Sequence, residues 1–162
     1  MQRDIYKQLL RWKNKKTRKP LILNGARQVG KTYILREFGE KEYQKVAFFS
    51  LDRNQKVREV FEKSGNTADI LMALSAISQV NITPGDTLLV LDEIQDCPKA
   101  LEALKFFCEE TPDIHIVVAG SLLGLSLHDG TSYPVGKVEE MRLYPMTFLE
   151  FLNAMGKTQL VD

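Results

Sequence analysis

Cysteine and long hydrophobic runs are scarce in this sequence, and their scarcity narrows the classes of protein it fits. The two cysteines, Cys97 and Cys108, are too few for a disulfide framework and lack the spacing of a metal site. No stretch approaches the roughly 18 uninterrupted apolar residues of a transmembrane helix. Residues 1–4 carry a charge of each sign and lead into no apolar run, so we expect no signal peptide. We therefore expect a cytoplasmic protein without a membrane partner, with the Cys108 thiol buried on an apolar helix face.

A surplus of either charge is also absent. The 22 Lys and Arg residues nearly balance the 21 Asp and Glu residues, and the net charge of +1 neither favours nor excludes a nucleic-acid partner. An apolar content of 44% and a charged content of 27% are typical of a globular protein, without repeats or low-complexity segments. A chain of 162 residues is expected to form one domain with a single substantial core.

The clearest motif lies between an apolar run and a predicted helix. Residues 21–24 predict a buried strand that stops at Gly25, and Tyr33 to Phe38 predicts a helix. Between them the sequence fits the phosphate-loop pattern G-x-x-x-x-G-K-[ST], in the strand–loop–helix context that the pattern requires. The residues expected to bind nucleotide are Gly25, Ala26, Arg27, Gln28, Val29, Gly30, Lys31, Thr32 and Tyr33.

Each fixed position of this pattern has a physical task. Gly25 and Gly30 let the backbone curl so that its N–H groups face phosphate oxygens, and the helix start adds unpaired N–H donors. Lys31 places an ammonium against the β- and γ-phosphates, and the Thr32 hydroxyl is a ligand for Mg²⁺. The alternative is a strand–turn–helix connection with two turn glycines and no nucleotide.

A second buried strand, at residues 87–92, ends in an acidic pair. Because ligands bind at the carboxyl ends of parallel strands, Asp92 is expected on the metal beside Thr32. Glu93 lies one residue further and is expected to orient or deprotonate the attacking water. The alternative is an acidic surface turn after a strand.

Strands and helices alternate along the rest of the chain. We predict further strands at 45–52, 114–120 and 138–143, further helices at 3–13, around 57–61, at 67–80 and at 99–109, and a helix stop at Gly39. Such alternation predicts an α/β fold with helices on both sides of a parallel sheet. We expect a three-layer P-loop NTPase fold with a central, mostly parallel sheet of about five strands. With an extra strand between the two motifs, the expected fold resembles that of the AAA class of P-loop proteins.

The single domain, residues 1–162, divides into three parts. We expect residues 1–19 to form a helix and a basic segment, residues 20–145 the nucleotide-binding core, and residues 146–162 an amphipathic helix that leads into a C-terminal region. The basic segment contacts nucleic-acid phosphates on one interpretation, and on the other, which we favour, it is a solvated helix end. Its cations are Arg11, Lys13, Lys15, Lys16, Arg18 and Lys19. The last helix has capping-box spacing at Thr147 and Glu150, and its apolar stripe is Phe148, Phe151, Leu152 and Met155.

Two patterns indicate which nucleotide binds and which type of reaction follows. The inserted strand with Asp92 and Glu93 favours P-loop proteins that use glutamate as a base over nucleotide kinases. No Asn-Lys-x-Asp guanine-reading motif is present, so ATP with Mg²⁺ is expected rather than GTP. His115 and His128 have no second ligand at metal spacing, and we expect both to be structural.

Four segments together resemble one known family. They are residues 25–32, Leu-Asp-Glu-Ile-Gln at 91–95 with Pro98, Ala-Gly-Ser at 119–121, and Leu-Tyr-Pro-Met-Thr-Phe-Leu-Glu-Phe at 143–151. They resemble the prokaryotic AAA-type ATPases that carry a C-terminal DUF4143 domain. This resemblance implies an ATP-binding core followed by a larger C-terminal region. It also implies a sensor role for Ser121 on the water or γ-phosphate, although Ser121 is equally a candidate helix N-cap.

The sequence departs from the family at one position. Where members commonly have Gly-Arg, this chain has Gly136-Lys137, and lysine lacks the planar fork of an arginine finger. A finger role for Lys137 is therefore in doubt.

Three functions remain, and the first is our leading hypothesis. It is Mg²⁺-dependent ATP hydrolysis with Lys31, Glu93 and Ser121 at the reacting phosphate. Turnover would be slow in the isolated domain, because a finger supplied by a partner is worth about 10³–10⁵ in rate. The second is a nucleotide-gated interaction or nucleic-acid-binding module, and the third is a phosphotransferase. Expected partners are ATP and either a second copy of the chain or the C-terminal region, with nucleic acid weakly supported.

Overall fold

The computed structural model describes residues 4–26, 29–121 and 133–145, together with positions 149, 151, 152, 155 and 156. A five-stranded sheet lies at its centre, in the order β2-β3-β4-β1-β5. Every neighbouring pair is parallel, which confirms the predicted α/β fold with a parallel sheet. The strands are β1 (Leu21–Gly25), β2 (Lys45–Ser50), β3 (Thr87–Asp92), β4 (His115–Gly120) and β5 (Glu139–Leu143).

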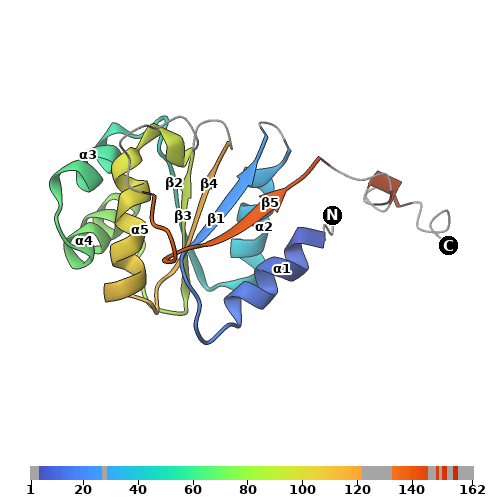
Figure 1. Cartoon of the computed structure of the whole chain (residues 1–162), viewed down its shortest axis with the longest axis horizontal. Helices are drawn as coiled ribbons and strands as arrows, with labels where there is room; N and C mark the ends of the chain where they lie inside the picture. The colour runs from blue at the N-terminus through green and yellow to red at the C-terminus, as the bar shows by residue number, and fades with distance from the viewer. Residues whose placement is uncertain are drawn as a thin grey trace.

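Helices cover both faces of this sheet, so the fold has the three predicted layers (Figure 1). One face carries α1 (Asp4–Lys13) and α2 (Lys31–Glu42), and the other carries α3 (Gln55–Lys63), α4 (Thr67–Ser78) and α5 (Pro98–Glu110). A short 3₁₀ turn, η1 (Ile94–Asp96), follows β3. Among the described residues, no helix has the length and apolar character needed to cross a membrane.

The core is divided between the two faces by the alternation of side chains along each strand. In β1, Leu21 and Leu23 pack with α1 and α2, whereas Ile22 packs with α3, α4 and α5. Because both faces are covered, the central strands are buried at every position. This explains why β1, β3 and β4 were recognisable as continuous apolar runs.

Side-chain caps fix the start of two helices on the α3–α5 face. Asn54 accepts a hydrogen bond from Val57 N at 3.2 Å, and Asn66 accepts one from Asp69 N at 2.8 Å. Each satisfies a donor that a helix leaves unpaired in its first turn, and losing such a cap costs about 1 kcal/mol.

The predicted helix stop at Gly39 is wrong, because α2 continues to Glu42. A Cβ at position 39 would lie 2.7 Å from Val46 Cγ2, so the glycine lets the helix approach β2 closely. The predicted burial of the Cys108 thiol is also wrong: Cys97 is the buried cysteine, and Cys108 is only partly covered. The other element boundaries agree to within about two residues, the usual uncertainty of helix and strand ends.

The predicted C-terminal helix falls largely outside the described residues. Its capping pair, Thr147 and Glu150, and the stripe residue Phe148 are not among them. Of the other stripe residues, Leu152 is buried, whereas Phe151 and Met155 are about half exposed.

Candidate functional site

A large cavity lies where the parallel strands end. Strand β4 lies between β1 and β3 in the sheet, so the ends of β1, β4 and β3 form one edge. The cavity at this edge has a volume of about 690 Å³, within the roughly 300–1,000 Å³ of sites for small ligands. Its lining residues are Gly30, Lys31, Thr32, Tyr33, Asp52, Arg53, Asp92, Glu93, Gln95, Asp96 and Ser121.

The loop between β1 and α2 needs glycine at both of its fixed positions. Gly30, with φ of 95°, occupies the left-handed region that favours glycine and caps α2. At Gly25 the reason is space, because a Cβ there would lie 2.8 Å from Leu143 O and 3.0 Å from Val29 Cγ2. The predicted nucleotide contacts Arg27 and Gln28 lie outside the described residues.

Lys31 is held under this loop. It is only 8% exposed, and its Nζ donates to the backbone oxygens of Gly25 and Ala26, both at 2.8 Å. An ammonium group is thereby positioned at the start of α2, where the helix adds N–H donors and the positive end of its dipole. Tyr33, two residues further along α2, is exposed and lines the same cavity.

A hydrogen bond joins the two predicted motifs. Thr32 Oγ1 donates to Asp92 Oδ2 at 2.6 Å, and Asp92 Oδ1 accepts from Glu93 N at 3.0 Å. Asp92 is 5% exposed, so its carboxylate is held in place at the end of β3. A hydroxyl and a carboxylate are ligands that suit Mg²⁺, which commonly takes its remaining ligands from water and phosphate.

The described residues contain no group of three His, Cys, Asp or Glu side chains arranged for a metal ion. A metal at this edge would be held by the oxygen atoms of Thr32 and Asp92 together with ligands from solvent or substrate, and oxygen ligands of this kind suit Mg²⁺.

Glu93 has an unusual backbone conformation. Its φ and ψ are 57° and 50°, a left-handed conformation that costs a residue other than glycine roughly 1–2 kcal/mol. Its carboxylate accepts a hydrogen bond from Gln95 Nε2. Such strained residues cluster at functional sites, and Glu93 lies on the wall of the cavity.

Sequence reasoning missed four cavity residues: Asp52, Arg53, Gln95 and Asp96. The predicted strand 45–52 ends at Ser50 instead, so Asp52 and Arg53 lie past its end and face the cavity. A useful signal was available, since β2 was expected to be parallel to β3 and to end at the same edge. Ser121 lies on the cavity wall after β4, while the helix that it would cap on the alternative interpretation lies outside the described residues.

The other candidates lie away from this cavity. Lys137 Nζ pairs with Glu109 Oε1 at 3.4 Å, near the amino end of β5. His115 begins β4, where burial and the neighbouring cations Arg18 and Lys13 lower its pKa to about 4. Burial raises the pKa of the Cys97 thiol, which argues against a thiolate nucleophile. His128 lies outside the described residues.

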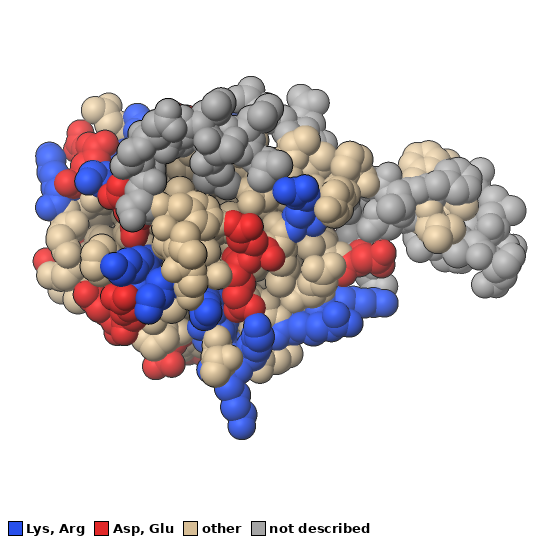
Figure 2. Space-filling view, viewed as in Figure 1, with Lys and Arg blue, Asp and Glu red and all other residues tan. Residues whose placement is uncertain are grey.

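The basic segment after α1 is partly tied to the fold. Figure 2 shows Lys and Arg side chains projecting along the α1 side of the molecule. Lys15 pairs with Glu139 at 2.5 Å, and Lys13 Nζ donates to Glu42 O at 2.6 Å. Arg18 donates to the backbone oxygens of Lys13 and Lys15. These contacts support the structural interpretation of this segment.

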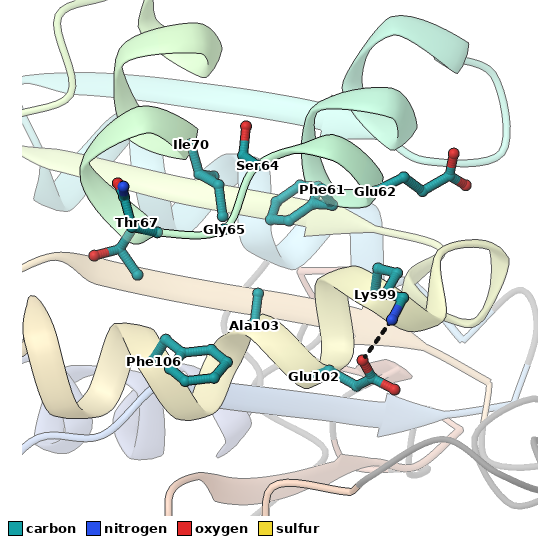
Figure 3. A pocket seen from close by; sticks show the side chains of 11 residues that line it. Phe61, Glu62, Ser64, Gly65, Thr67, Ile70, Lys99, Glu102, Ala103 and Phe106 are labelled. Carbon is teal, nitrogen blue, oxygen red and sulfur yellow. Dashed lines mark ion pairs between the residues drawn. The ribbon is translucent and has the colours of Figure 1, made fainter.

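A second, smaller cavity of about 200 Å³ lies between the α3–α4 turn and α5 (Figure 3). Phe61, Ile70 and Phe106 supply its apolar wall, and the ion pair of Lys99 with Glu102 lies at one end. None of the residues predicted to bind nucleotide lines it, so the candidate site is the larger cavity.

Comparisons with known proteins agree with this fold. Residues 17–152 match the sequence profile of the AAA domain, whereas no curated protein gives a significant sequence match. Similar solved structures include the Drosophila ORC bound to DNA, with a TM-score of 0.63 and 16% identity over 96% of this chain and 46% of that chain. Cdc6p from Pyrobaculum aerophilum has a TM-score of 0.54 and 16% identity, over 88% of this chain and 43% of that chain.

The ORC1 protein of Aeropyrum pernix in complex with DNA is similar as well, with a TM-score of 0.55 and 15% identity over 97% of this chain and 47% of that chain. At such identities the likeness establishes the fold alone. The chain spans a little under half the length of these proteins.

Proposed function

This chain belongs to the AAA domain family, and on that basis we propose that it binds Mg²⁺-ATP in the 690 Å³ cavity and hydrolyses it. The observation that carries the proposal is the hydrogen bond of 2.6 Å between Thr32 Oγ1 and Asp92 Oδ2. It brings together two oxygen ligands from separate motifs at the edge where parallel strands end. In this proposal Thr32 and Asp92 hold Mg²⁺, which when bound neutralises charge on the phosphate oxygens.

The remaining residues of the cavity have distinct tasks. Lys31 exchanges the backbone oxygens it now contacts for phosphate oxygens, and the N–H groups at the start of α2 face the same anion. Glu93 accepts the proton of the attacking water as the water oxygen bonds to the γ-phosphorus. The bond between that phosphorus and the bridging oxygen breaks, and ADP and inorganic phosphate result. Ser121 hydrogen-bonds the water or the γ-phosphate.

Lys31→Ala tests the nucleotide-binding half of the proposal. Because a charged contact to phosphate is lost, we expect the affinity for labelled ATP to fall by roughly 10- to 100-fold. The matched control is Lys41→Ala on the same helix, where the lysine is exposed and pairs with Glu37 at 2.7 Å, away from the cavity. Equal ATP affinity of wild type and Lys31→Ala would show that ATP does not bind at this loop.

The alternative is a nucleotide-gated module that binds a partner and hydrolyses little. Two of the similar structures are complexes with DNA, and cations follow α1 here. Tight ATP binding without phosphate release at high protein concentration would favour this alternative. Under either function we propose that a second copy or a C-terminal DUF4143 region packs on the half-exposed Phe151 and Met155.

A further inference from the structure

Gln95 is held in contact with Glu93 by the turn that carries both residues. Its Nε2 donates to Glu93 Oε2. The turn itself is closed by backbone hydrogen bonds from Asp96 N to Glu93 O at 3.0 Å and from Cys97 N to Ile94 O at 3.1 Å. Ile94 is fully buried in the core and anchors the turn. The backbone position from which the Gln95 side chain reaches Glu93 is therefore set by the fold.

The end of β4 leaves room for this amide only because residue 120 is glycine. A Cβ on Gly120 would lie 2.7 Å from Gln95 Oε1 and 2.8 Å from Ile94 Cγ2. Any larger residue would push the amide away from the strand and, with it, the donor that reaches Glu93. Gly120 directly precedes Ser121, so this packing occurs on the wall of the candidate site.

The arrangement includes two unfavourable features. Gln95 Oε1 is buried and has no hydrogen-bond partner among the described residues, which typically costs about 1–3 kcal/mol. Glu93 has a left-handed backbone. Turning the amide over would bring its oxygen against the Glu93 carboxylate, so the carboxylate fixes which end of the amide faces it.

We propose that Gln95 is a positioning residue for Glu93, an inference that rests on the proposed ATP hydrolysis. The amide N–H holds Oε2 of the carboxylate and leaves Oε1 to accept the proton of the attacking water. Gln95 transfers no proton itself. Its effect is to keep the carboxylate in one orientation, since a freely rotating base spends less time aligned with the water.

Gln95→Met is the direct test, because methionine has similar length and volume but no amide. We expect kcat for phosphate release to fall roughly 10- to 100-fold, the loss of one hydrogen bond to a charged group. KM and the affinity for ATP should stay within about twofold, since the amide contacts the base and not the phosphate-binding residues. The matched control is Gln55→Met, which removes an exposed glutamine that donates to Glu59 at 3.3 Å on α3.

A double-mutant cycle separates positioning from general damage. In a Glu93→Gln background, Gln95→Met should lower single-turnover phosphate release no further, because the base it orients is gone. Two results would overturn this inference while leaving the proposed ATP hydrolysis intact. One is an equal loss of phosphate release on Gln95→Met in the wild-type and Glu93→Gln backgrounds. The other is an unchanged kcat in Gln95→Met when the wild type hydrolyses ATP normally. Absence of Glu93-dependent phosphate release from the wild type would overturn the proposed function as well. Gly120→Ala, which displaces the amide without removing it, should also lower kcat with unchanged ATP affinity.

Discussion

The two ends of the parallel sheet both bury polar side chains, but they differ in how these are paired. At the amino end, the Tyr43 hydroxyl and His115 Nδ1 lie 2.6 Å apart in a hydrogen bond, and Thr87 Oγ1 donates to Asn81 O at 3.3 Å. At the carboxyl end, Asn24 Oδ1 and Gln95 Oε1 are buried with no hydrogen-bond partner in the described part of the chain. Thr32 and Asp92, at the same end, are paired with each other. Of the described residues with a buried atom that has no hydrogen-bond partner, Gln95 lines the candidate site, whereas Arg18 and Tyr133 do not.

Left-handed backbone conformations also occur in two different settings. Two described residues other than glycine have positive φ, Gln79 and Glu93. Gln79 ends α4, where a left-handed residue commonly terminates a helix. Glu93 instead lies between β3 and η1 at the cavity. A left-handed residue at a helix end needs no further explanation, whereas the strained backbone of Glu93, next to Asp92, supports a function for Glu93.

The largest expected effect is on the rate of phosphate release and concerns Glu93, at the carboxyl end of the sheet. Glu93→Gln keeps the size of the side chain and removes its basicity, so we expect phosphate release to fall by about 10²–10⁴. ATP affinity and thermal stability should be nearly unchanged, because the hydrogen bond from Glu93 N to Asp92 is retained. The control is Glu102→Gln, which changes a glutamate at the smaller cavity. Equal rates of phosphate release in Glu93→Gln and wild type would remove Glu93 from the reaction.

At the amino end the expected effect is on stability and not on activity. Burial lowers the pKa of His115 from 6.5 to about 4, so between these values the unfolded chain binds more protons than the folded one. Stability should therefore be constant above about pH 7 and fall as the pH drops toward 4, by up to about 3 kcal/mol from this residue.

Denaturant unfolding at a series of pH values measures this loss. His115→Asn should lower stability at pH 7 and flatten the dependence of stability on pH. Tyr43→Phe, which removes only the partner hydroxyl, should retain that pH dependence. An identical pH dependence in His115→Asn and wild type would assign the loss to other groups.

The skeleton of both the fold and the candidate site could be read from the sequence. Continuous apolar runs marked the central strands, and the motif at residues 25–32 placed its strand, loop and helix in order. Because parallel strands end at one edge, Asp92 could be placed beside Thr32 without knowledge of the strand order. The hydrogen bond between these two side chains agrees with that prediction.

The parts that could not be predicted depend on packing between distant segments. Gly39 has the pattern of a helix stop, and only its contact with Val46 shows that it is a packing position. The end of β2 at Ser50, which places Arg53 at the cavity, depends on pairing with β3. The contact of Gln95 with Glu93 depends on a 3₁₀ turn and on the space above Gly120. None of these leaves a periodic signal in the sequence.

The smallest expected effect concerns the cations after α1. Lys15 pairs with Glu139 at 2.5 Å, but its side chain is 53% exposed, so Lys15→Ala should change the free energy of unfolding by less than about 1 kcal/mol. Lys16→Ala, at the next and also exposed lysine, is the matched control for the stability measurement. On the structural interpretation, neither change alters how DNA affinity depends on salt. If this segment contacts phosphates, each substitution lowers the slope of the logarithm of the DNA association constant against log salt concentration by about one. That result would favour the nucleic-acid-binding function.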